Sequence, residues 1–244
     1  MSKAVMSDRL NRSASTVRTM TVALAEEVAI LIPRTHAGRS AAKRLTKKGL
    51  RMTDQIVVGL ASWIILDTNY PDFKSGSEAA FALVFSPKKP LEDIAPHAAV
   101  APSRIHRGSG VYGIIAQVVH VAEDWWVIDA GVLAFQDSSP PVDAKPGAWL
   151  RGEIQIDIDP YDYFEHWGHQ PGVPALIYEW RIDKIEVQTA PYVEISPRKF
   201  ALDATKLGWR EVAETKAFED PAGEYLLHCT RLNGPRWPRS KRLP

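Results

Sequence analysis

Hydrophobic and polar residues alternate along most of the chain after residue 52, and this pattern predicts β-strands. In AWLRGEIQIDID the apolar residues share one parity and the charged or polar residues share the other. Successive side chains of a strand point to opposite faces, so this segment predicts a strand with one buried and one hydrated face. Further runs rich in apolar and β-branched residues predict strands at QIVVGLASWIIL, AAFALVF, VYGIIAQVVHV, WWVIDAGVLAF, LIYEWRIDKIEVQ and EYLLHCTRL.

Two local features indicate how the predicted strands connect and bend. Residues 122–124 separate two apolar runs and predict a tight hairpin. In LIYEWRIDKIEVQ the apolar parity changes at Asp183 and Lys184, which predicts a β-bulge or a bend. About eight strands are expected, and they do not alternate with helices as parallel sheets require. We therefore predict a mainly β fold, a curved antiparallel sheet that forms a barrel or a sandwich, with an OB-like barrel as one form.

Composition divides the chain into three segments. Residues 1–51 hold 11 Lys/Arg and 3 Asp/Glu, and TVALAEEVAILI predicts one N-terminal helix in a basic arm that is partly helical or disordered. Residues 52–232 are predicted to form a single β-rich domain, and residues 233–244 a basic, flexible tail. The whole chain has a net charge of +1, but residues 52–230 sum to −12 and residues 231–244 to +5. An acidic body thus carries two basic ends.

Cysteine content and hydropathy bear on the compartment. Cys229 is the single cysteine, so no intramolecular disulfide can form, and its position on the parity of Tyr225 predicts an inert, buried side chain. No segment approaches the ~18 apolar residues of a membrane span. We therefore expect a cytoplasmic protein. The sequence leaves four start residues open: Met1, Met6, Met20 and Met52.

Residues 151–172, RGEIQIDIDPYDYFEHWGHQPG, concentrate carboxylates and aromatic side chains. The first half is the hydrated face of a strand, and the second half is a loop bounded by prolines. Exposed aromatic residues beside acidic groups suit protein recognition. The residues predicted to form this acidic, aromatic-lined face are Glu153, Asp157, Asp159, Tyr161, Tyr163 and Trp167.

The same loop offers a metal site as an alternative. His166 and His169 form a His-x-x-His pattern, and nearby carboxylates would supply oxygen ligands for zinc or iron. No third histidine has a familiar spacing. A metal-dependent enzyme centred on these two histidines is the second alternative function.

Adjacent tryptophans add to the aromatic residues of this protein, which has eight tryptophans in all. In an extended segment, Trp125 and Trp126 point to opposite faces, so one of them must point away from the core. Some aromatic side chains are therefore expected at the surface.

The C-terminal segment TRLNGPRWPRSKRLP interleaves cations with a tryptophan. Arginine and lysine beside a stacking aromatic suit the backbone and bases of single-stranded nucleic acid. The residues concerned are Arg236, Trp237, Arg239, Lys241 and Arg242. Against this interpretation, the net charge of −12 on residues 52–230 repels a polyanion. A nucleic-acid-binding β-barrel that uses its basic termini is the first alternative function.

Other familiar motifs do not point to catalysis. GSGVYG matches the glycine pattern of a dinucleotide site, but a proline-rich loop precedes it and a strand follows, so it predicts a turn with a bulge. The sequence has no G-x-S-x-G elbow, P-loop or C-x-x-C pair, and no cofactor is expected. The leading prediction is a non-enzymatic cytosolic module that recognises a protein through its acidic face, as an immunity or inhibitor protein binds a basic enzyme.

Overall fold

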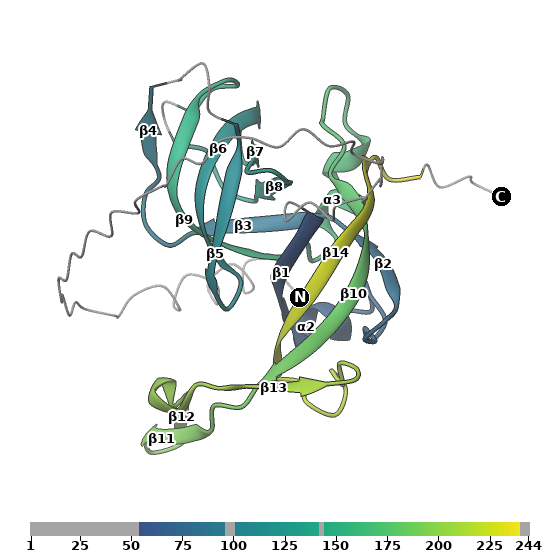
Figure 1. The fold of residues 1–244 in the computed structure, drawn as a ribbon. Coiled ribbons are helices and arrows are strands. Elements are labelled where there is room, and N and C mark those ends of the chain that lie inside the picture. The colour runs from purple at the N-terminus through teal and green to yellow at the C-terminus, as the bar shows by residue number, and fades with distance from the viewer. Residues whose placement is uncertain (1–53, 96–100, 142–143, 240–244) are drawn as a thin grey trace, which may run out of the picture. The chain divides into compact units, whose positions relative to one another are not determined.

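The computed structural model of this protein describes residues 54–95, 101–141 and 144–239. These residues form a mainly β structure, as the alternation predicted, with one 12-stranded and one 2-stranded sheet (Figure 1). Within these ranges, no helix is long and apolar enough to cross a membrane. The predicted N-terminal helix and the four candidate start residues lie outside the described residues.

Five strands close into a barrel, which confirms the predicted fold class. The five are β3 (Leu83–Pro87), β6 (Val111–Val121), β7 (Trp126–Asp129), β8 (Leu133–Gln136) and β9 (Trp149–Ile158). Their pairings run β3–β9–β6–β7–β8 and return to β3, and β3–β8 is the parallel pair of this ring. Five is also the strand number of the OB barrel.

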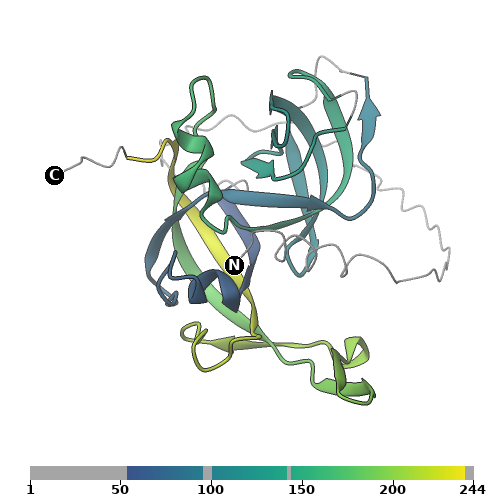
Figure 2. The ribbon, with the colours of Figure 1, turned by 180° about the vertical axis from the view of Figure 1, so that it is seen from behind.

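A second set of strands lies outside the five-strand ring and is connected to it at β9. Strand β1 (Gln55–Ala61) has a parallel bridge from Gly59 to Asp157 of β9 and pairs antiparallel with β14 (Glu224–Arg236). β14 pairs with β10 (Ile177–Gln188), whose other edge takes β2 (Glu78–Phe81) and β13 (Trp209–Val212). Because only Ala82 separates β2 from β3, the chain passes directly from this sheet into the barrel (Figure 2).

Shorter elements extend these sheets or connect their strands. β4 (Glu92–Ile94) pairs with β9, and β5 (Ser103–Gly108) pairs with β6. β11 (Tyr192–Ser196) and β12 (Lys199–Leu202) pair with each other as the 2-stranded sheet. The helical segments are α2 (Ser62–Leu66), α3 (Asp162–Glu165), η3 (Trp167–His169) and η4 (Ala204–Lys206).

Several local predictions are confirmed. The apolar parity of β9 is buried, and the register of β10 against β14 shifts between Ile182 and Lys184, at the predicted bulge. The 122–124 turn joins β6 to β7. The first half of GSGVYG forms the turn between β5 and β6, where Gly108, Ser109 and Gly110 all have positive φ, and its second half begins β6. Cys229 is buried.

Two segments differ from the prediction. QIVVGLASWIIL ends as a strand at Ala61 and continues as α2, because Ser62 is held by bonds to the carbonyls of Asp220 and Gly223. Strand β14 reaches Arg236, four residues into the predicted tail, and still pairs with β10 there. The basic segment therefore starts as part of the sheet.

The structure buries both adjacent tryptophans. Trp126 packs in the larger core cluster, and Trp125 packs in a second cluster on the other side of β7 with Val127 and Phe135. The segment from Tyr163 to Ile177 covers this second cluster. The two rings do point to opposite faces, but the chain's own loop covers the outward one.

Candidate binding sites

The structure does not assemble the predicted acidic, aromatic-lined face. Glu153 is exposed on the barrel, whereas Asp159 and Tyr163 are both 0% exposed. Trp167 is half-buried and stacks on Trp125, with ring centroids 5.0 Å apart and planes 8° apart. The prediction of this face is therefore wrong for Asp159 and Tyr163, because the loop that follows β9 folds back onto the barrel.

Asp159 anchors that loop. Its carboxylate accepts the backbone N–H groups of Asp162 at 2.9 Å and Tyr163 at 3.2 Å. Burial, and secondarily the Asp162 carboxylate, raise the pKa of Asp159 to about 8. The Tyr163 hydroxyl donates to the Pro174 carbonyl at 2.6 Å. These groups satisfy one another inside the protein, so their role is structural.

Asp157 lies apart from the loop, at the junction of the barrel with β1. The Gln155 amide donates to its carboxylate at 3.1 Å, and burial raises the pKa of Asp157. A Cβ at Gly59 would lie 2.0 Å from an Asp157 side-chain oxygen, so a larger residue there would displace the Asp157 carboxylate. Desolvation, together with the Asp157 carboxylate, raises the pKa of Glu224 to about 7. The sequence did not predict this acidic pair, because the two residues are 67 positions apart.

The loop and the C-terminal segment meet in a recess of about 940 Å³, which we call the loop–tail pocket. It is lined by residues of the loop, of β10 and of the C-terminal segment: Tyr161, Phe164, Glu165, His166, His169, Glu179, Arg236, Pro238 and Arg239. The rings of Tyr161 and Phe164 are stacked, with centroids 4.5 Å apart. Residues predicted for three different functions therefore line one site, while Lys241 and Arg242 lie outside the described residues.

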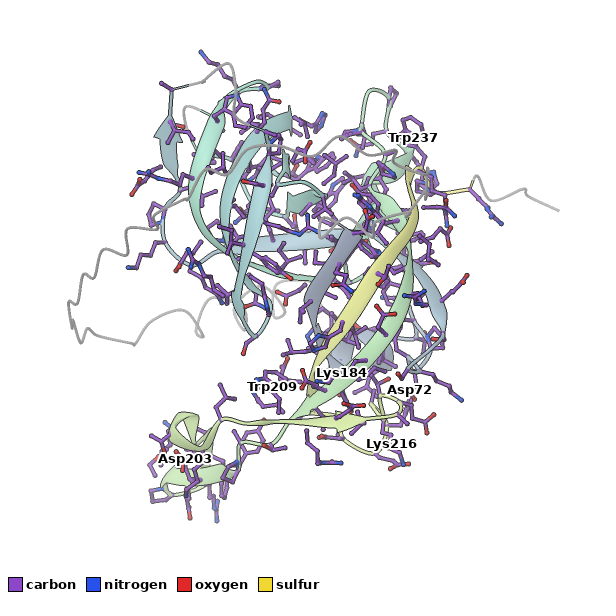
Figure 3. All side chains as sticks on the ribbon, in the orientation of Figure 1. Asp72, Lys184, Asp203, Trp209, Lys216 and Trp237 are labelled. Carbon is purple, nitrogen blue, oxygen red and sulfur yellow. The ribbon has the colours of Figure 1, made fainter. Side chains whose placement is uncertain are left out.

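Close packing holds the two segments of the pocket together. A Cβ at Gly168 would lie 2.5 Å from Pro238 Cγ and 2.7 Å from the Tyr163 carbonyl, so this contact requires glycine. The indole N–H of Trp237, labelled in Figure 3, donates to the Val173 carbonyl at 2.9 Å. Arg236 Nε lies 2.9 Å from Glu179 Oε1.

The two histidines are exposed at the rim of the loop–tail pocket. His169 Nε2 lies 2.9 Å from the Phe164 carbonyl oxygen, which uses one ring nitrogen. Across the described part of the chain, no group of three or more His, Cys, Asp or Glu side chains is arranged to hold a metal ion.

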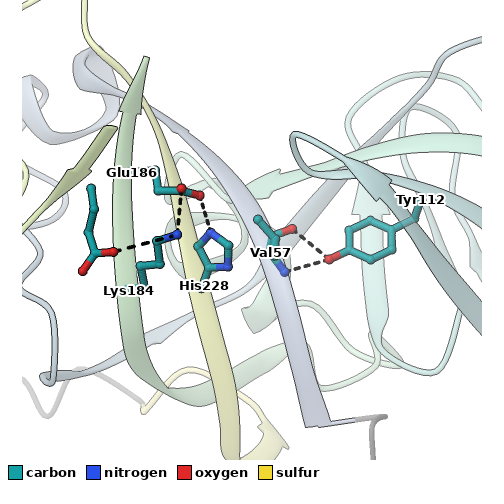
Figure 4. Close-up of polar contacts among 6 residues, drawn as sticks. Val57, Tyr112, Lys184, Glu186 and His228 are labelled. Carbon is teal, nitrogen blue, oxygen red and sulfur yellow. Dashed lines mark hydrogen bonds and ion pairs between the residues drawn. The ribbon is translucent and has the colours of Figure 1, made fainter. Parts of the chain in front are cut away.

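A second recess, of about 760 Å³, lies between strands β1 and β5, and we call it the β1–β5 groove. The Tyr112 hydroxyl accepts the Val57 N–H at 2.7 Å and donates to the Val57 carbonyl at 3.1 Å (Figure 4). Arg104 donates to the Gln55 carbonyl at 3.1 Å. Side chains from β5 and β6 thus cap the backbone edge of β1, which would otherwise be open to another strand.

A row of polar and charged side chains on β10 and β14 borders the β1–β5 groove. Glu186 accepts from Lys184 at 2.8 Å and contacts His228 Nε2 at 2.6 Å (Figure 4). The hydrogen bond from Lys184 lowers the pKa of Glu186. Lys184 and Glu186 share one face of β10, and the contact between Glu186 and His228 joins β10 to β14. Polar pairs across neighbouring strands stabilise a hydrated sheet face.

The third candidate is the pair β11–β12, which we call the apolar hairpin. It projects from the sheet that contains β10 and β13 (Figures 1 and 2). All five residues of β11 are exposed, and the exposed fractions of Tyr192, Ile195 and Phe200 are 54%, 65% and 62%. The alternation of apolar and polar residues predicted no strand here. The pattern of exposed apolar side chains emerges only with the pairing.

No protein-family model, no curated protein and no solved structure matches this chain.

Proposed function

We propose that this protein is a binding module that docks onto another protein through the apolar hairpin. The exposure of Tyr192, Ile195 and Phe200 on a two-stranded projection carries this proposal. An isolated two-stranded hairpin is marginally stable in water, and contiguous exposed apolar side chains mark interaction surfaces. A bound partner buries the exposed apolar side chains of the hairpin.

The register of the hairpin supports a partner that surrounds it. Tyr192 pairs with Leu202 and Glu194 pairs with Phe200, so Tyr192 and Phe200 share one face, while Val193 lies on the other. Apolar side chains on both faces cannot all be covered by packing against one flat surface. A groove in the partner would cover both.

The charges of the hairpin define the chemistry of that groove. Arg198 lies in the turn between the strands, Lys199 begins β12, and the one acidic residue of 192–202 is Glu194. Glu194 accepts the Arg198 backbone N–H at 2.9 Å. An apolar groove with acidic groups at its rim complements this arrangement, which replaces the basic partner expected from the acidic face. Such a function requires no catalytic group.

The test removes apolar contacts from the hairpin without touching the core. The double variant Ile195→Ser, Phe200→Ser should keep its free energy of unfolding within about 0.5 kcal/mol, as surface changes usually do. Its affinity for a protein partner should fall by about 30-fold or more, the loss expected for interface hot spots. The partner is isolated by affinity capture with wild type, and the affinity is then measured by calorimetry.

Phe218→Ser is the matched control, because Phe218 is 70% exposed but lies outside the hairpin. It should bind the captured protein as wild type does. Equal affinity of the hairpin variant and wild type would place the interface elsewhere. Sedimentation of wild type and of the hairpin variant, each measured without the captured protein, shows whether the partner is a second copy of this chain.

A further inference from the structure

Trp237 combines exposure with a fixed position. Its side chain is 57% exposed, while its indole N–H is bound to the Val173 carbonyl at 2.9 Å. A tryptophan that merely fills a gap would be buried, and one on a free chain would have no such bond. The ring is therefore held at the surface, and its chain neighbours Arg236 and Pro238 line the loop–tail pocket. A flat ligand group can stack on such a fixed ring with little loss of side-chain entropy.

Two arginines that are close to Trp237 in the sequence line the pocket. Arg236 is held by Glu179 at 2.9 Å and by the Trp237 carbonyl at 3.2 Å. These bonds use two of the five N–H donors of its guanidinium. Arg239 lines the same pocket and is exposed. Fixed N–H donors beside an aromatic face suit a phosphate that is joined to a planar group.

The opposite wall of the loop–tail pocket adds further aromatic surface. Tyr161 and Phe164 are both half-buried and stacked on each other, so part of each remains in contact with solvent. His166 and His169 are exposed on the same wall. The pocket, of about 940 Å³, thus combines aromatic surface with two imidazoles, two arginines and the two carboxylates of Glu165 and Glu179.

We propose that the loop–tail pocket binds single-stranded nucleic acid, with bases stacked on Trp237 and on the Tyr161–Phe164 wall and with phosphates bound by Arg236 and Arg239. Single strands expose base faces for stacking, whereas a duplex hides them. This site is independent of the apolar hairpin, since it shares no residue with it.

The charge of the body limits how such binding works. Residues 52–230 sum to −12 and oppose the approach of a polyanion, so the attraction must come from the local arginines. Each phosphate contact of a single strand contributes about −0.7 to the slope of log affinity against log salt. Contacts from Arg236 and Arg239 predict a slope of about −1.4, and stacking must supply the remaining affinity.

The experiment titrates the full chain into a fluorescein-labelled oligothymidine of about twelve nucleotides and follows anisotropy between about 50 and 200 mM salt. Trp237→Ala should weaken binding by about 5-fold to 150-fold, the loss of one stacked base. Trp237→Phe keeps an aromatic face and should bind more tightly than Trp237→Ala. Arg239→Gln should reduce the salt slope by about 0.7.

Three controls show whether binding depends on the loop–tail pocket itself. Trp63→Ala, which removes a 47% exposed tryptophan from α2, should leave the affinity unchanged. Gly168→Ala, which forces Pro238 away from the loop, should weaken binding even though every contact residue is intact. A duplex of the same length should bind less tightly than the single strand.

Absence of binding at low salt by wild type would overturn the proposal. So would a Trp237→Ala affinity equal to that of wild type, or equal binding of a polyglutamate peptide, which would show a general anion site. If Trp237→Ala does not fold, as judged by thermal melting, the salt slope of Arg239→Gln decides the question. Truncation at residue 233 is unsuitable, because it removes four residues of β14.

Discussion

Replacing Trp125 by alanine should lower the free energy of unfolding by about 3–5 kcal/mol, the cost of deleting a fully buried tryptophan. Trp125 is 1% exposed, and its ring contacts Phe135 and Trp167 with centroids 6.3 Å and 5.0 Å away. Alanine leaves a cavity between the barrel and the loop that follows β9. Urea denaturation, analysed with a common m-value, measures the change.

Trp63→Ala is the matched control for this prediction. Trp63 is 47% exposed, and its removal should change the free energy of unfolding by about 0.5 kcal/mol or less. A loss below about 1 kcal/mol for Trp125→Ala would mean that the loop does not cover β7 and β8 in solution. Hydrogen exchange of residues 162–169 should also accelerate in Trp125→Ala, because their packing surface is lost.

The fold class could be predicted from the sequence because strand alternation is a local signal. The buried parity of β9, the bulge in β10 and the turn at Gly108 all depend on residues within one segment. Closure into a barrel depends on pairings between β3 and β8 or β9, which are 46 or more residues apart. No local pattern specifies which strands pair, so the sequence did not distinguish a barrel from a sandwich.

Sites formed by distant segments were predicted only in part. The loop and the basic C-terminal segment were each recognised from their composition, but their meeting at Gly168 and Pro238 joins positions 70 residues apart. The burial of Asp159 and Tyr163 was missed, because a polar strand end followed by an aromatic loop has the composition of a surface segment. The apolar hairpin was missed because its strands are short and a turn with proline lies between them.

Wild-type stability should fall as the pH rises from about 6 to about 8, and Asp159→Asn should reduce this fall. The pKa of Asp159 is about 8 in the folded protein because the group is buried, whereas an unfolded aspartate titrates near pH ~4. Between these values the folded state binds the extra proton, so raising the pH favours unfolding. The contribution is at most about 1.4 kcal/mol per pH unit.

Asparagine at position 159 keeps the shape of the carboxyl group but does not titrate. One of its two oxygen positions becomes an amide, so it can accept from Asp162 or Tyr163 but not from both, and the variant should be about 1–3 kcal/mol less stable than wild type at pH 6. As the pH rises from about 6 to about 8, wild type loses the stability that depends on protonated Asp159, and the variant has no such group to titrate. The difference in free energy of unfolding between the two proteins should therefore shrink by up to about 3 kcal/mol.

Denaturation of both proteins at several pH values separates this group from its neighbours. Glu224, whose pKa is about 7, shifts stability in the same direction, but it is present in both proteins and cancels in their difference. Glu153→Gln removes an exposed carboxyl group from β9, the strand that precedes Asp159, and should follow the wild-type curve, since exposed charges contribute little. Parallel curves for wild type and Asp159→Asn would show that Asp159 stays ionised in this range, held by its two backbone N–H donors.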